Sequence, residues 1–174
     1  MKFISQQINK LKKTYPFLKE LKSFGSFELL KNSNYAQVIV EACIPFQPGV
    51  YLVFALDKTG NDRDLLYYGK AGVTANKGNP LLNFHQLPSR LLAATSIPGS
   101  HKFLHKNNKV DKHMNSKDIT RARLWPWYVN NKYKDGIRVY WFITDWSIGQ
   151  NPNYYENQIK KYTIIIDPNW EKSI

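Results

Sequence analysis

Three consecutive segments set the fold of this chain: Gly49-Val-Tyr-Leu-Val-Phe-Ala-Leu56, the short stretch Lys58-Thr-Gly-Asn-Asp62, and Leu65-Leu-Tyr-Tyr-Gly69. The first and third are rich in β-branched and aromatic residues, which is typical of strands. Gly and Asn in the second favour a turn, because both tolerate backbone conformations that other residues avoid. The three segments together predict a β-hairpin.

The flanking segments predict one more strand and several helices. The run Ile137–Thr144 is again apolar, aromatic and β-branched, as in a strand. Pro88 suits the start of a helix that carries Arg90, and Pro152 suits the start of the last helix. Apolar residues also recur at helical spacing on both sides of Pro16. We therefore expect an α+β fold: a small three-stranded antiparallel sheet flanked by helices, with N-terminal helices and an inserted basic segment.

The length of the chain fits one domain. Its 174 residues, of which 43% are hydrophobic, can bury a core but are too few for two comfortable domains. Within a single domain over 1–174 we expect three parts. These are a helical and strand extension over 1–46, a core over 47–97 and 136–174, and a basic insertion over 98–135.

Positive charge is concentrated in two stretches. The formal net charge is +12, from 25 Lys and Arg against 13 Asp and Glu. Residues 1–33 hold seven Lys and two Glu, and residues 100–135 hold nine Lys or Arg and three Asp. Such a distribution favours a polyanionic partner. Charge alone does not distinguish nucleic acid from an anionic membrane surface.

Other features favour a soluble protein of a reducing compartment. The longest apolar run, Val50–Leu56, is too short to cross a bilayer, so we expect no membrane partner. The single cysteine, Cys43, excludes an intramolecular disulfide. Lys outnumbers Arg twenty to five and Asn is abundant, which hints at an A+T-rich genome. We expect a cytoplasmic protein of bacterial or viral origin.

A set of short motifs occurs in order along the predicted elements. Gly49-Val-Tyr51 lies on the first strand and Tyr67-Tyr-Gly69 on the second, and Arg90, Glu156 and Asn169 follow. Together they resemble the GIY-YIG nuclease family over roughly residues 47–92 and 137–170. The resemblance implies a metal-dependent endonuclease that hydrolyses phosphodiester bonds. The short chain with an embedded insertion is most similar to a stand-alone type II restriction endonuclease of that family.

The resemblance also implies a role for each residue. Two tyrosines, Tyr51 and Tyr67, would lie at the attacking water and the scissile phosphate, and the Lys70 cation would lower a tyrosine pKa. Arg90 offers a planar fork for a phosphate. Glu156 would bind the metal, one Mg²⁺ per active site or Mn²⁺ in its place, because Mg²⁺ needs only one or two protein carboxylates. The terminal asparagine of the family corresponds to Asn169, which would hold the end of the chain by hydrogen bonds.

The sequence departs from the family pattern at two places, of which the first is a tolerable loop extension and the second leaves the general base open. The hairpin is longer than in the family, and Ala94 stands four residues after Arg90, where many members carry Tyr or His. Either Tyr51 acts alone, or His101 or His105 from the insertion replaces the missing group. A non-catalytic basic nucleic-acid-binding module, or a structure-specific repair or homing nuclease, is the alternative function.

The basic stretches predict contacts to double-stranded DNA. Lysines suit phosphates, whereas Arg and Asn make forked contacts to guanine and adenine. We therefore expect the N-terminal lysines to bind the backbone and the insertion to read bases. One active site per chain would require a homodimer on DNA, or two successive events, to cut both strands. The candidate DNA contacts are Lys10, Lys12, Lys13, Lys102, Lys106, Asn115, Arg121, Arg123, Asn130 and Asn131.

Overall fold

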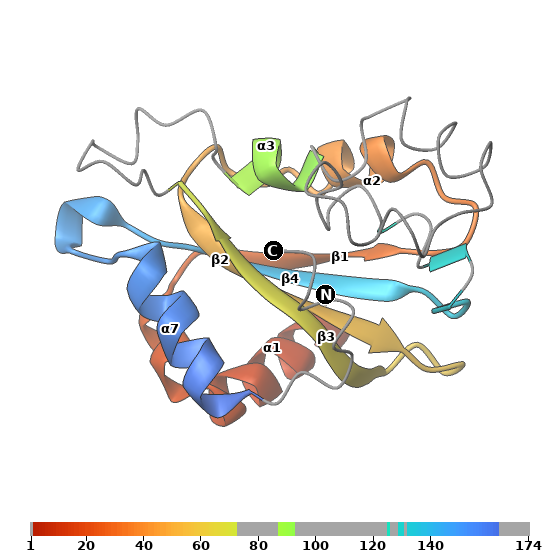
Figure 1. Cartoon of the computed structure of the whole chain (residues 1–174), viewed down its shortest axis with the longest axis horizontal. Coiled ribbons are helices and arrows are strands. Elements are labelled where there is room, and N and C mark those ends of the chain that lie inside the picture. The colour runs from red at the N-terminus through yellow and green to blue at the C-terminus, as the bar shows by residue number, and fades with distance from the viewer. Residues whose placement is uncertain (1, 73–86, 93–124, 126–128, 131, 164–174) are drawn as a thin grey trace, which may run out of the picture.

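A computed structural model of the protein describes residues 2–72, 87–92, 125, 129–130 and 132–163. The predicted α+β class is confirmed: helices lie on both sides of an antiparallel sheet (Figure 1). Within the described residues the sheet has four strands in the order β1-β4-β2-β3. Their bounds are Phe24–Leu29 for β1, Gly49–Leu56 for β2, Asp62–Ala71 for β3 and Ile137–Ile143 for β4.

The predicted number of strands is wrong by one. The hairpin β2–β3 and the later strand β4 are confirmed, but β1 extends the sheet on the far side of β4, from Phe24↔Phe142 to Leu29↔Ile137. All seven residues of β4 are buried, so this strand is covered on both faces and paired along both edges. The short strand β1 pairs with one edge of β4, and β2 pairs with the other.

The helices form two layers on opposite faces of the sheet (Figure 1). On one face lie α1 (Lys2–Thr14), the short 3₁₀ helix η1 (Pro16–Glu20) and α7 (Pro152–Tyr162). On the other lie α2 (Tyr35–Glu41) and α3 (Leu87–Leu92). Each layer therefore covers one set of alternating strand side chains. None of the described helices is both long and apolar enough to cross a membrane.

Local signals account for most of these helices. The predicted N-terminal helices are confirmed, and the α-helix ends before Pro16, which has no N–H to continue the ladder. The last helix begins at Pro152, as predicted, and the Asn151 side chain accepts a hydrogen bond from the Asn153 amide at 2.9 Å. Pro88 lies in the first turn of α3. Two short elements were not predicted: α2, and a 3₁₀ turn over Trp146–Ile148.

An ionic cluster around the buried Arg138 links β3 of the hairpin to β4 and β1. The Arg138 guanidinium of β4 donates to Glu28 of β1 and to Asp62 of β3, both at 2.6 Å, and to the Gly60 carbonyl at 2.8 Å. Tyr140 donates to Asp62 at 2.6 Å. Although burial alone would lower the pKa of Arg138, these partners raise it above its usual value. The cluster links β1, β3 and β4 at one end of the sheet, and the predicted site lies at the other end.

Candidate functional site

Two tyrosines of the predicted set lie together beside Gly69. Tyr51 of β2 pairs in register with Gly69 of β3, and Tyr67 is two residues before that glycine, so both rings project from the same face. Their centroids are 5.7 Å apart, with one ring edge-on to the other. A β-carbon on Gly69 would lie 2.7 Å from each hydroxyl oxygen. The hydroxyls therefore converge on a space that exists because residue 69 has no side chain.

The two tyrosines differ in their access to solvent. Tyr51 is 3% exposed and also packs edge-on against Trp125, with centroids 6.2 Å apart. Tyr67 is partly exposed. The sequence did not point to Trp125 as a neighbour of this pair, and it gave Gly69 no role beyond its place in the motif. A glycine inside a predicted strand is the signal that could have suggested a close approach there.

Lys70 and Glu156 form a second pair on the other face of the sheet. Because side chains alternate along a strand, Lys70 projects away from the tyrosines and toward the layer that contains α7. Its ammonium donates to Oε2 of Glu156, which lies on α7. From the sequence we expected the Lys70 cation to lie near a tyrosine and to act on it. The structure joins Lys70 to Glu156 instead.

The fold brings the two pairs to one end of one strand but not to one face. Gly69 and Lys70 are adjacent, so their α-carbons are about 3.8 Å apart. The two tyrosines beside Gly69 and the Lys70–Glu156 pair nevertheless lie on opposite faces of the sheet. In the described part of the chain β3 is an edge strand. A ligand that reaches both pairs would therefore have to lie against the edge of β3.

The backbone of Arg90 lies on the same face of the sheet as the two tyrosines. It belongs to α3, whose Leu87 and Leu91 pack in the same buried cluster as Tyr51. Its side chain is outside the described part of the structure. Several predicted residues lie wholly outside the described residues, namely Ala94, His101, His105 and Asn169.

The N-terminal lysines have different surroundings. Lys12 donates to the Leu21 carbonyl at 3.2 Å and lies 3.8 Å from the centroid of the Phe24 ring. Burial lowers the pKa of the Lys12 ammonium. Lys10 and Lys13 are exposed. Among the three, Lys12 therefore has contacts within the protein that would compete with a DNA phosphate.

The insertion is described only in part. Asn130 is described, and its side-chain oxygen accepts a hydrogen bond from the Asn32 amide at 3.4 Å, so this side chain helps to hold the loop after β1. The other base- and phosphate-contact candidates of the insertion lie outside the described residues: Lys102, Lys106, Asn115, Arg121, Arg123 and Asn131.

The described residues around Glu156 can be compared with what a metal ion requires. Within the described residues there is no group of three His, Cys, Asp or Glu side chains that could hold a metal ion. Structural zinc requires about four such ligands, whereas Mg²⁺ keeps most of its waters and accepts one or two carboxylates. The Glu156 carboxylate has two oxygens, of which Oε2 contacts Lys70. Among the described residues, the single carboxylate of Glu156 is a donor of the kind that a hydrated Mg²⁺ accepts.

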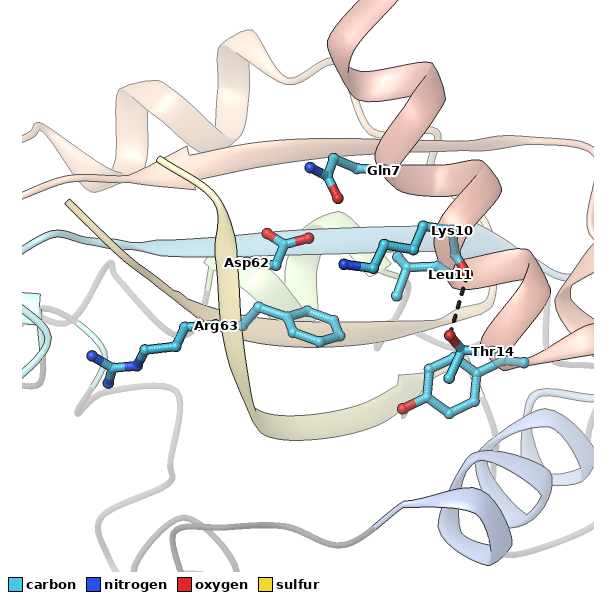
Figure 2. A pocket seen from close by; sticks show the side chains of 8 residues that line it. Gln7, Lys10, Leu11, Thr14, Asp62 and Arg63 are labelled. Atoms are coloured by element: carbon cyan, nitrogen blue, oxygen red, sulfur yellow. Dashed lines mark hydrogen bonds between the residues drawn. The ribbon is translucent and has the colours of Figure 1, made fainter. Parts of the chain in front are cut away.

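A small pocket lies at the opposite end of β3. It has a volume of about 180 Å³ between α1 and the hairpin, and Figure 2 shows Lys10 extending toward Asp62 while Arg63 points away. Asp62 is already bonded to Arg138 and Tyr140, and Arg63 is paired with Asp64 at 2.6 Å. The charges of Asp62 and Arg63 are thus already paired within the protein, whereas Lys10 also lines the pocket and is exposed. Asp62 and Lys70 are eight positions apart, about 26 Å along a strand.

Comparisons with known proteins do not add to this description. No protein-family model, no curated protein and no solved structure matches the chain.

Proposed function

We propose that the protein is a metal-dependent DNA endonuclease that hydrolyses phosphodiester bonds, of the GIY-YIG type and acting as a sequence-specific restriction enzyme. The observation that carries the proposal is the convergence of two tyrosyl hydroxyls beside Gly69, one residue from the Lys70–Glu156 pair. These are residue types that phosphodiester hydrolysis uses: a group to orient water, a cation for phosphate and a carboxylate for Mg²⁺. The net charge of +12 favours a nucleic-acid substrate.

In this proposal the two tyrosines have different roles. Tyr67 is partly exposed and is the one that solvent reaches, so its hydroxyl would orient the attacking water. Tyr51 is buried and packs against Tyr67, so it would hold the Tyr67 ring in place. Water would attack phosphorus and lose a proton to solvent as the bond to the leaving oxygen breaks, and the leaving oxygen would take up a proton from solvent. This refines the expectation from the sequence, in which Tyr51 was the tyrosine proposed to act as base.

The other groups would act on the phosphate. With the scissile phosphate at the edge of β3, the Lys70 ammonium would contact its non-bridging oxygens. Glu156 would hold a hydrated Mg²⁺, which supplies charge for the developing oxyanion. Arg90 on α3 would contact the phosphate from the tyrosine side.

Cleavage of bacteriophage DNA tests the proposal. Purified protein with Mg²⁺ should give discrete bands, and EDTA should prevent cleavage. Glu156→Gln should abolish cleavage while DNA affinity stays within a factor of about two, because the variant loses a ligand and not a positive charge. The matched control is Glu41→Gln, which changes an exposed glutamate on α2 and should cut at the wild-type rate.

Other cleavage outcomes would change the assignment. A smear or simple nicking would favour a structure-specific or non-specific nuclease. Cleavage that survives EDTA, or that survives Glu156→Gln, would contradict the metal assignment.

A non-catalytic nucleic-acid-binding module is favoured by one observation. The tyrosine pair and the Lys70–Glu156 pair leave β3 on opposite faces, and an enzyme would need both at one phosphate. If the protein binds duplex DNA but leaves plasmid intact with Mg²⁺ and with Mn²⁺, the binding module is the better description.

A further inference from the structure

The carboxylate that would hold Mg²⁺ already has a cation beside it. The Lys70 ammonium contacts Oε2 of Glu156, and the two positive charges would repel each other at a shared carboxylate. The side chains are 33% and 23% exposed, so water and ions reach the pair. The Lys70 ammonium therefore competes with a divalent cation for the Glu156 carboxylate, which the cation can reach from solvent.

The position of Glu156 does not depend on Lys70. Its helix, α7, is anchored by the buried residues Pro152, Tyr155 and Ile159. Tyr155 in addition donates to Glu20 at 2.9 Å. Lys70, by contrast, is a long, partly exposed side chain near the end of an edge strand. The pair can thus open by rotation of the lysine side chain while the helix stays in place.

We propose that Lys70 is a latch on Glu156: it keeps the affinity of the resting protein for divalent cations low and releases the carboxylate when a DNA phosphate draws the ammonium away. This inference rests on the proposed function, because it takes Glu156 as the metal ligand. A phosphate attracts an ammonium strongly through charge-assisted hydrogen bonds. Metal and DNA then bind with positive cooperativity, since each favours the open pair.

Titration with Mn²⁺ measures the latch without cleavage. The electron paramagnetic resonance signal of free Mn²⁺ gives the bound fraction. Lys70→Gln should bind Mn²⁺ about tenfold more tightly than the wild type, because a neutral amide no longer competes. Lys70→Arg keeps the charge and should stay near the wild-type value. Lys160→Gln removes a charge one turn from Glu156 on the same helix and should change affinity less than about threefold.

A second measurement adds duplex DNA to the titration. DNA should tighten Mn²⁺ binding to the wild type by about the same factor as Lys70→Gln does, and should add much less to that variant. Lys70→Met, which keeps the aliphatic stem, replaces Lys70→Gln if circular dichroism shows that the latter is unfolded.

The possible results separate the latch from the proposed function. Equal Mn²⁺ affinity for folded Lys70→Gln and wild type overturns the latch, while cleavage with Mg²⁺ would still support the nuclease. Wild-type Mn²⁺ affinity in Glu156→Gln overturns both the latch and the metal assignment. Equal tightening by Lys70→Gln and Lys160→Gln overturns the latch as well, because it reduces the effect to general charge.

Discussion

Replacement of Gly69 by alanine should disturb both tyrosines at once. The added methyl carbon would lie 2.7 Å from the Tyr51 hydroxyl oxygen, 2.7 Å from that of Tyr67 and 2.8 Å from Cζ of Tyr51. Ordinary van der Waals contacts begin near 3.4 Å, so each hydroxyl would have to retreat by about 0.7 Å. Tyr51 has little room for this, because it is buried between Tyr67 and Trp125.

The expected loss of stability follows from two opposing effects. Overpacking a buried site costs about 1–3 kcal/mol. Alanine in place of a strand glycine returns about 0.5–1 kcal/mol through backbone entropy. We expect Gly69→Ala to lower the free energy of unfolding by about 1–2 kcal/mol in urea titrations followed by circular dichroism. DNA cleavage should fall by up to about 10²-fold, because displacements approaching 1 Å have that effect on positioned groups.

A second substitution shows whether the hydroxyls cause the effect. In the Gly69→Ala background, Tyr51→Phe removes one of the two oxygens that the methyl group meets, and should restore at least about 0.5 kcal/mol. Tyr68→Phe is the matched control, because that ring packs on the opposite face, and it should restore nothing. A Gly69→Ala protein as stable as the wild type would refute the reasoning. The reasoning would also be refuted if Tyr51→Phe changed the free energy of unfolding equally in the wild type and in Gly69→Ala.

Three further predictions concern residues outside the tyrosine pair. Lys12→Ala should lower the thermal unfolding temperature and leave the salt dependence of DNA binding unchanged, whereas Lys13→Ala should reduce the slope of log affinity against log salt by about 1. Equal slopes for the two variants in anisotropy titrations would contradict this distinction. Tyr35→Phe should stabilise the fold by up to about 1 kcal/mol, because no hydrogen-bond partner of its buried hydroxyl is found among the described residues. Tyr140→Phe should instead destabilise the fold by about 1–3 kcal/mol, because its hydrogen bond to Asp62 is lost. Burial raises the pKa of Tyr35 to about 12, so the unfolded state, with a pKa near 10, ionises first. Stability should therefore fall between about pH 10 and 12 in denaturation at increasing pH, and less steeply for Tyr35→Phe.

The hairpin and the main helices were accessible from the sequence because their signals are local. β-Branched and aromatic runs separated by a Gly-Asn turn predict paired strands without reference to the rest of the chain. Pro152 and the Asn before it likewise mark a helix start wherever the helix packs. Tyr51 and Tyr67 were singled out from the sequence through the family resemblance, and their place on paired strands follows from the same local signals.

What the tertiary structure decided depends on partners distant in the chain. A strand was expected within 1–46, but Phe24–Leu29 joins the sheet because β4 offers it an edge to pair with, and six residues of sequence do not show that edge. Lys70 meets Glu156 across 86 residues, because α7 packs on the face toward which Lys70 projects. Gly69 gains its role only when register places Tyr51 opposite it. Local chemistry determines the elements, whereas register and packing determine which side chains meet, because a shift of one residue in a strand moves every side chain to the other face.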